Sequence, residues 1–372
     1  MQKLIVLSTL LSIAAALPQR NRGGRTQQTA QQQAAQVPQG ISQAQDGSMI
    51  LDDTVMVNGL PIRFKISAPA DQFLPASGVP GAAATSSNGT MGANVLLHGD
   101  GGQSFFDMPN QNVQANTMGV ALLAPNENLF WGGGQGLQRT DGVAHAQAVN
   151  DFIQTEMPQR VAVDMSNVVF TGVSGGSLLM SGFFIPAQMQ NYPNSAVELN
   201  CGAMPPQVAF QNAATVMPQT RIHYQSTQSE LQSLQGSIPQ AVVAYEQLAA
   251  GAGMSVAQIN QLQTVDNTPA GGHCAFDGQD FVSGVQTMLT SYSSVMQGGN
   301  GVVQGLGAPS NGVVANGVVG NENLQFVAGR KREAEAESMV IARWAQDVVE
   351  ETEFQVLSCD RTSCEDEVET RF

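Results

Sequence analysis

Short apolar runs separated by helix-length segments make up the middle of this 372-residue chain. Continuous apolar runs are typical of parallel strands buried on both faces, and the segments between them supply the crossover helices that such strands need. The runs are ANVLLHG, GVALLAP, NVVFTGV, AVELNCG and RIHYQS. The pattern predicts one α/β domain over about residues 48–298, with a mostly parallel central sheet flanked by helices.

The domain is expected to open with an antiparallel hairpin. In DTVMVNGLPIRFKISAP, apolar and polar residues alternate on both sides of Asn58 and Gly59. Asn-Gly between two alternating runs is the strongest short-range signal for a two-residue hairpin turn. Two antiparallel strands should therefore precede the parallel part of the sheet.

The ends of the chain differ from this domain in composition. Residues 1–16 combine Lys3, an apolar run and a group of alanines, which is the layout of a secretory signal peptide. Residues 17–47 are rich in Gln and Ala and almost lack large apolar residues, so we expect a disordered arm. Residues 299–330 predict a flexible Gly-, Asn- and Val-rich linker, with a β-prone segment as the alternative, and residues 331–372 form an acidic tail.

Charge narrows the range of partners. Only 12% of the residues are charged and the formal net charge is −15. Binding of nucleic acid or of an anionic membrane needs clustered Lys and Arg, so neither partner is expected. The N-terminal apolar run is too short for a mature membrane span. The prediction is a secreted, extracellular protein, and the sequon at Asn88 is its candidate glycosylation site.

The segment NVVFTGVSGGSLLM contains a G-x-S-x-G pattern from Gly172 to Gly176. A strand precedes the pattern and an apolar helix follows it, which is the context of a nucleophile elbow. The two outer glycines are needed because side chains there would clash with the strand and the helix. We expect Ser174 to be a catalytic nucleophile in an α/β-hydrolase fold; the alternative is a glycine-rich turn with an incidental serine.

An earlier loop, LLHGDGGQSFFD, is expected to stabilise an oxyanion. Glycine-rich backbone can bring N–H groups close to the oxygen that becomes negatively charged during acyl transfer. The candidate donors are Asp100 and Gly101 in this loop and Gly175 after the nucleophile. The loop departs from the HGGG form because it carries Asp100, and the alternative is an ordinary glycine turn.

The catalytic base should follow Ser174, because α/β hydrolases place the triad in the order Ser, acid, His. His223 lies in an apolar strand, where a packed, hydrogen-bonded histidine is expected, whereas His273 lies on the glycine-rich loop NTPAGGHCAFDG before the last helix. His273 is therefore the predicted base. Glu230, in the loop after RIHYQS, is the predicted acid, and Asp266 is the alternative, although it could instead cap a turn near His273.

The chain has four cysteines, which can pair in three ways. Cys201, at the end of AVELNCG, and Cys274, next to the predicted base, are both expected at the carboxyl edge of the predicted sheet. A bridge between them would clamp the loop of His273, and Cys359 would then pair with Cys364 in the tail. Disulfides are expected because the protein is predicted to be secreted.

The set LLHGDGG, LAPNENLFW, TGVSGG and AGGHCAFDG resembles secreted fungal α/β hydrolases of the polyhydroxybutyrate depolymerase and feruloyl esterase type. The resemblance covers roughly residues 48–298. It implies hydrolysis of carboxylic esters, with a polyester or plant cell-wall ester as substrate, Ser174 as nucleophile and His273 as base. No metal or other cofactor is expected. The alternative is a catalytically silent hydrolase-like protein that binds at the cell wall or at a host surface.

The sequence at the start of the tail has two interpretations. The segment KREAEAES resembles the processing spacer of fungal secreted precursors, which implies cleavage by a processing protease after Lys331 and Arg332. The alternative interpretation is that this segment is the solvated start of an amphipathic helix.

Overall fold

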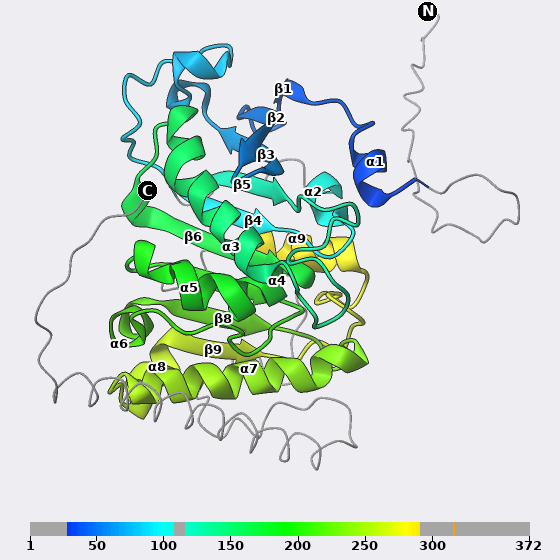
Figure 1. Cartoon of the computed structure of the whole chain (residues 1–372), viewed down its shortest axis with the longest axis vertical. Helices are drawn as coiled ribbons and strands as arrows, with labels where there is room; N and C mark the ends of the chain where they lie inside the picture. The colour runs from blue at the N-terminus through cyan, green and yellow to red at the C-terminus, as the bar shows by residue number, and fades with distance from the viewer. Residues whose placement is uncertain (1–27, 108–115, 291–314, 317–372) are drawn as a thin grey trace, which may run out of the picture.

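A ten-stranded sheet forms the centre of the part of the chain that the structure describes, residues 28–107, 116–290 and 315–316 of a computed structural model (Figure 1). The strands are β1 (Gly40–Gln43), β2 (Met49–Val57), β3 (Leu60–Ala68), β4 (Gly92–Leu97), β5 (Thr117–Leu123), β6 (Val168–Val173), β7 (Ala196–Asn200), β8 (Arg221–Gln225), β9 (Gln263–Asp266) and β10 (Ala315–Asn316).

The order of the strands defines the fold. Across the sheet it is β1-β2-β3-β5-β4-β6-β7-β8-β9-β10. Strands β5, β4, β6, β7, β8 and β9 pair with one another in parallel, whereas β1, β2, β3 and β10 are joined to the sheet by antiparallel pairs. This order, with β5 between β3 and β4, is the α/β-hydrolase topology, so the predicted fold is confirmed.

Helices cover both faces of the sheet. They are α1 (Ala30–Ala34), α2 (Gln103–Asp107), α3 (Gly142–Asp151), α4 (Gly175–Leu179), α5 (Ile185–Gln188), α6 (Ala213–Val216), α7 (Gln232–Gly251), α8 (Val256–Leu262) and α9 (Phe281–Thr290). Helices α3 to α8 pack on one face, and α2 and α9 pack on the other (Figure 1). Among the described residues, no helix has the length and apolar character that crossing a membrane requires.

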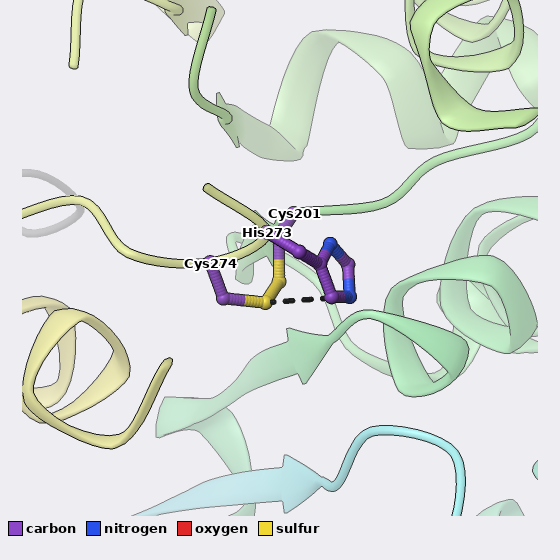
Figure 2. Close-up of side chains that lie close together, drawn as sticks. All are labelled: Cys201, His273 and Cys274. Atoms are coloured by element: carbon purple, nitrogen blue, oxygen red, sulfur yellow. Dashed lines mark hydrogen bonds between the residues drawn. A yellow bond between two sulfur atoms is a disulfide. The ribbon is translucent and has the colours of Figure 1, made fainter. Parts of the chain in front are cut away.

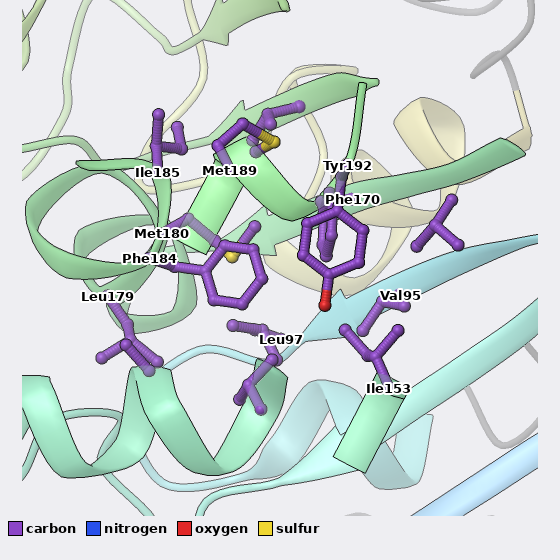
Figure 3. Packing of buried hydrophobic residues seen from close by; sticks show 14 of the residues in the cluster. Val95, Leu97, Ile153, Phe170, Leu179, Met180, Phe184, Ile185, Met189 and Tyr192 are labelled. Atoms are coloured by element: carbon purple, nitrogen blue, oxygen red, sulfur yellow. The ribbon is translucent and has the colours of Figure 1, made fainter. Parts of the chain in front are cut away.

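Two apolar cores lie on the opposite faces of the sheet. Because side chains alternate along a strand, β6 contributes Phe170 to one core and Val169 and Val173 to the other. The ring of Phe170 lies 4.9 Å from that of Phe184 and 5.1 Å from that of Tyr192 (Figure 3). Burial on both faces explains why the central strands read as continuous apolar runs.

The predicted hairpin is present as β2 and β3. Asn58 and Gly59 form its turn with φ values of 51° and 81°. Positive φ at both central residues is the requirement of a type I′ turn, whose twist matches that of the two strands. The sequence signal and the local geometry therefore agree.

Part of the predicted disordered arm is folded, so that prediction is wrong for residues 28–47. Strand β1 pairs with β2, and the N–H of Gln31 in α1 donates to the carbonyl of Glu127 at 2.9 Å. The Arg63 guanidinium donates to the carbonyl of Ala34 at 2.8 Å. Hydrogen bonds to the domain order this segment, and the low content of large apolar residues does not reveal them.

The other predicted terminal segments lie mostly outside the described residues. These are the signal peptide of residues 1–16, the acidic tail of residues 331–372, and the linker of residues 299–330 apart from Ala315 and Asn316. The latter two residues form β10, which pairs with β9 and so places a short strand in the predicted linker.

Glu198 is a fully buried carboxyl group in the middle of β7. Its register partners are Thr171 on β6 and His223 on β8. Burial raises the pKa of Glu198 to about 8, against a smaller lowering effect of the Asn200 side chain. Burial also lowers the pKa of His223 to about 4, so both groups are neutral at pH 7.

We expect Glu198→Gln to remove one source of pH dependence in stability. Between the ordinary pKa of 4.5 and the raised value of about 8, the folded protein holds a proton that the unfolded chain releases. The contribution of Glu198 to the free energy of unfolding is therefore largest below pH 4.5. It falls by about 1.4 kcal/mol per pH unit up to pH 8. Urea unfolding of both proteins across this range measures the difference, in which the contributions of the shared histidines cancel. An equal slope in both proteins would contradict the expectation.

Candidate active site

Ser174 occupies the turn between β6 and α4. Its φ is 49° and its ψ is −111°, a combination that costs about 1–3 kcal/mol for a residue with a side chain. The turn is held by the Ser174 N–H, which donates to the carbonyl of Asn200 at 2.8 Å, and by the Leu178 N–H, which donates to the carbonyl of Ser174 at 3.1 Å. The side chain is thereby presented at the carboxyl end of the parallel strands, as in a nucleophile elbow.

The outer glycines of the motif have no room for a side chain. A Cβ on Gly172 would lie 2.7 Å from the Cα of Ser177, and a Cβ on Gly176 would lie 2.1 Å from the carbonyl oxygen of Leu97. Both contacts involve backbone that cannot move without disturbing the sheet or the helix. The spacing of the motif therefore follows from close packing between β4, β6 and α4.

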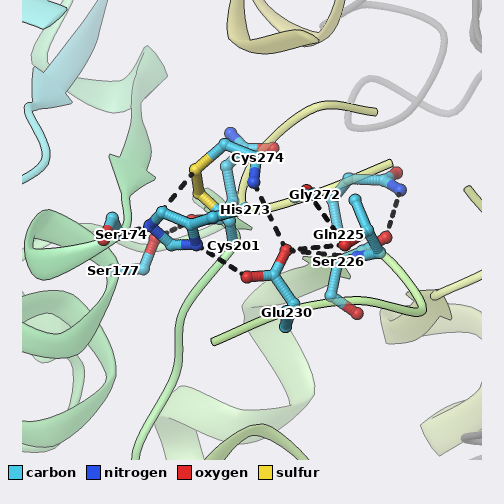
Figure 4. Close-up of a disulfide and its surroundings, with 11 residues drawn as sticks. Ser174, Ser177, Cys201, Gln225, Ser226, Glu230, Gly272, His273 and Cys274 are labelled. Carbon is cyan, nitrogen blue, oxygen red and sulfur yellow. Dashed lines mark hydrogen bonds and ion pairs between the residues drawn. A yellow bond between two sulfur atoms is a disulfide. The ribbon is translucent and has the colours of Figure 1, made fainter. Parts of the chain in front are cut away.

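Ser174, His273 and Glu230 form one chain of hydrogen bonds (Figure 4). The Oγ of Ser174 lies 2.9 Å from Nε2 of His273, and Nδ1 of His273 lies 2.7 Å from Oε2 of Glu230. The His273 side chain is 22% exposed, whereas that of Glu230 is completely buried. This is the geometry in which a carboxylate holds the Nδ1–H tautomer and leaves Nε2 free to accept a proton from the serine.

The second oxygen of Glu230 is bound by the surrounding loops. Oε1 accepts hydrogen bonds from the N–H and the Oγ1–H of Thr227, at 3.2 and 3.3 Å, and from the N–H of Cys274 at 3.4 Å. The Thr227 hydroxyl also lies 3.1 Å from the carbonyl of Gly272. Thr227 therefore ties the loop of Glu230 to the loop of His273, a contact that the sequence did not reveal.

The remaining candidates for acid and base are placed elsewhere. Asp266 Oδ1 accepts hydrogen bonds from the N–H and the hydroxyl of Thr268, so it caps a turn, and Glu230 occupies the position beside Nδ1. The alternative prediction of Asp266 as the acid is wrong for this reason. His223 bonds to Thr264 and Gln225 inside the sheet, as expected for a packed histidine.

Two backbone N–H groups flank Ser174. A Cβ on Gly175 would lie 3.2 Å from the Asp100 nitrogen, so these two residues are in close contact, and within residues 28–107 and 116–290 neither N–H has a protein acceptor. The N–H of Gly101 instead donates to the carbonyl of Leu129 at 3.1 Å. The structure thus brings together the predicted donors Gly175 and Asp100, whereas the prediction for Gly101 is wrong because its N–H is already bound.

His98 anchors the loop that carries Asp100. Its Nδ1 lies 2.6 Å from the carbonyl of Gly99, and its Nε2 accepts the N–H of Ala124 at 2.9 Å. Burial lowers the pKa of His98 to about 4, so the ring is neutral and can serve both bonds with one proton. His98 joins the ends of β4 and β5 and does not reach Ser174 as a base.

A disulfide joins Cys201 to Cys274 across 73 residues of sequence, as predicted (Figure 2). Cys201 follows β7, and Cys274 follows His273 directly, with its sulfur 3.8 Å from Nε2 of His273. Although these sulfurs and the imidazole lie close together, a disulfide sulfur is not the thiolate that binds a metal. The predicted pair of Cys359 and Cys364 lies outside the described residues.

Reduction of this disulfide is expected to lower activity before the domain unfolds. Release of Cys274 frees the backbone beside His273, and a misplacement of about 1 Å can cost on the order of 10²-fold in rate. Ester hydrolysis and intrinsic fluorescence, followed together during titration with dithiothreitol, measure the two events. Cys359→Ala/Cys364→Ala is the control and should keep the sensitivity. Loss of activity only together with unfolding would contradict this expectation.

Of the other predicted modification sites, the structure describes the glycosylation site but not the processing site. Asn88 is exposed in the loop before β4, so a glycan could be attached there without disturbing the core, and its glycosylation stays a prediction. Lys331 and Arg332, the predicted processing site, lie outside the described residues.

Comparison with known proteins gives distant structural similarities. No protein-family model matches the chain, and no curated protein matches it. Among solved structures, it is similar to a predicted CIB-like hydrolase from Thermoplasma acidophilum, with 13% identity, 66% of this chain and 99% of that chain covered, and a TM-score of 0.35.

A cold-adapted esterase from an Arctic intertidal metagenomic library has 14% identity, with 67% of this chain and 96% of that chain covered and a TM-score of 0.34. The acylaminoacyl peptidase of Pyrococcus horikoshii has 9% identity, with 66% of this chain and 41% of that chain covered and a TM-score of 0.39.

Proposed function

We propose that this protein is a secreted serine esterase that hydrolyses carboxylic esters through an acyl-enzyme intermediate. The observation that carries the proposal is the continuous hydrogen-bonded chain from Ser174 through His273 to Glu230 on a strained strand-to-helix turn. A serine in an incidental glycine-rich turn would have no reason to be aligned with a histidine and a buried carboxylate.

The first half of the reaction forms the acyl-enzyme. Nε2 of His273 accepts the Ser174 proton while Oγ bonds to the ester carbonyl carbon, and the carbonyl electron pair moves to the oxygen. The N–H groups of Asp100 and Gly175 donate to that oxyanion. The carbonyl re-forms, the bond to the alcohol oxygen breaks, and the imidazolium gives its proton to the departing alcohol.

The second half releases the acid. A water molecule gives a proton to Nε2 of His273 and its oxygen bonds to the acyl carbon, which again forms an oxyanion at the same two N–H groups. Collapse of this intermediate breaks the bond to Ser174 Oγ, which regains the proton from His273. Glu230 holds Nδ1 of His273 at 2.7 Å and stabilises the imidazolium that forms twice.

Features of the sequence support the proposed location and substrate class. The signal-peptide layout and the sequon at Asn88 support export, and the disulfide beside the base fits an oxidising compartment. The resemblance to polyhydroxybutyrate depolymerases and feruloyl esterases supports a polyester or a plant cell-wall ester as the substrate. Cleavage after Arg332 by a processing protease belongs to the same proposal.

A fluorophosphonate probe tests this function. Such a probe reacts with a serine that is activated by a neighbouring base, so it should label the wild-type protein at Ser174 and leave Ser174→Ala unlabelled. Peptide mapping identifies the modified residue. A wild-type protein that is folded, does not react and does not hydrolyse p-nitrophenyl esters would instead support a silent, hydrolase-like binding protein.

A further inference from the structure

The oxyanion loop carries a negative charge at the point where negative charge develops in the proposed reaction. Asp100 supplies one of the two N–H groups that have no protein acceptor in the part of the chain that the structure describes, and its carboxylate is 26% exposed. An uncompensated carboxylate at this position would oppose formation of the oxyanion, because like charges interact strongly where water is scarce. A functional site with Asp100 therefore needs a compensating group.

Arg139 provides that group. Its Nη1 lies 2.7 Å from Oδ1 of Asp100 and its Nη2 lies 2.8 Å from Oδ2, which is a bidentate ion pair. The Arg139 side chain is only 1% exposed, and Nη1 also donates to the carbonyl of Trp131 at 3.0 Å. The planar fork of the guanidinium fixes the direction of the carboxylate as well as its charge.

The loop of Arg139 is itself held in place. The N–H of Gly132 donates to Nδ1 of His145 at 2.8 Å, and the N–H of Asp141 donates to the carbonyl of Gly132. A Cβ on Gly132 would lie 2.8 Å from the Cβ of Arg139, so the backbone passes close beside the arginine. The guanidinium is therefore presented from a rigid support between β5 and α3.

Gly175, the residue after Ser174, leaves room for the Asp100 carboxylate beside Arg139. A Cβ on Gly175 would lie 2.0 Å from Oδ1 of Asp100, so any side chain there would displace the carboxylate from Arg139. The carboxylate also lies beside the first turn of α4, where the helix dipole favours negative charge. Asp100, Arg139 and Gly175 thus form one interlocked unit.

We propose that Arg139 is a positioning residue of the oxyanion site. It fixes Asp100 so that the Asp100 N–H points toward the substrate oxygen, and it cancels the charge of the Asp100 carboxylate in the transition state. The proposal rests on the esterase function proposed above, because it assigns to Arg139 a part in the same reaction.

Kinetics of Arg139→Gln and of Arg139→Gln/Asp100→Asn test the proposal. The single variant leaves an unpaired carboxylate beside the oxyanion, so kcat for p-nitrophenyl butyrate should fall about 10²-fold while KM changes little. The double variant removes that carboxylate, so it should recover most of the lost kcat. Arg160→Gln is the matched control, because it removes the same guanidinium from an ion pair with Glu156 on another part of the fold, and it should keep wild-type kcat.

Recovery in the double variant separates a charge effect from simple damage to the fold. If the double variant is as slow as Arg139→Gln, or if Arg139→Gln keeps wild-type kcat, the proposal is overturned. Thermal midpoints and fluorophosphonate labelling of Ser174 are measured on every variant. Failure of the esterase function itself would be recognised separately, because the wild-type protein would then neither hydrolyse the ester nor react with the probe.

Discussion

Replacement of Ser174 by alanine is expected to lower kcat/KM for p-nitrophenyl esters by on the order of 10⁴-fold or more, because it removes the hydroxyl that lies 2.9 Å from Nε2 of His273 and forms the acyl-enzyme. Stability should change by no more than about 1 kcal/mol, since the substitution removes one partly exposed hydrogen bond to His273. Initial rates and thermal midpoints, measured on the same preparations, give both quantities.

Ser177→Ala provides the matched control for this prediction. Ser177 lies one helical turn further along, and its hydroxyl donates to the carbonyl of Asn200 at 2.9 Å in a fully buried position. Its loss should cost about 1 kcal/mol of stability and leave the chemistry intact. Turnover retained by Ser174→Ala, or abolished equally by both variants, would place the active site elsewhere.

The elbow could be predicted from sequence because its requirements are local. The strand before Ser174, the two glycines and the apolar helix are all within about a dozen residues, and each is needed for steric reasons that the structure bears out at Gly172 and Gly176. The Asn58-Gly59 hairpin was predictable for the same reason. Signals of this kind depend on backbone conformation, which short segments determine by themselves.

Long-range hydrogen bonds could not be predicted in the same way. The order of residues 28–47 depends on bonds from Arg63 to Ala34 and from Gln31 to Glu127. Nothing in the composition of the arm reveals these contacts, because they satisfy backbone groups of a polar segment without burying much apolar surface. The same limit applies to Thr227, whose bonds to Glu230 depend on how two loops meet.

The ion pair of Arg139 could be predicted only in part from the sequence. Residues 48–298 contain only five basic side chains, Arg63, Lys65, Arg139, Arg160 and Arg221. A carboxylate in the oxyanion loop requires a cation nearby, so one of these five had to be a candidate partner. The sequence does not reveal which one, because the partners are separated by 39 residues and meet only where the loops after β4 and β5 lie side by side.

The assignment of the acid predicts the second large effect. Glu230→Gln should lower kcat/KM by about 10⁴-fold, because a neutral amide can hold His273 in the wrong tautomer and does not stabilise the imidazolium. The amide oxygen can still accept the bonds from Thr227 and Cys274, so the loops should remain connected. Rates with p-nitrophenyl butyrate and urea unfolding curves give the two measurements.

Asp266→Asn is the control for that experiment, and it makes the same change of one carboxylate to one amide. The Asn oxygen can keep the bonds from the N–H and hydroxyl of Thr268, so the turn after β9 should persist and kcat/KM should stay at the wild-type level. The two variants lose the same charge at different positions. Only the loss of the carboxylate that lies 2.7 Å from Nδ1 of His273 should lower kcat/KM. A large loss in Asp266→Asn with normal activity in Glu230→Gln would mean that the loops rearrange and that Asp266 is the acid of the working enzyme.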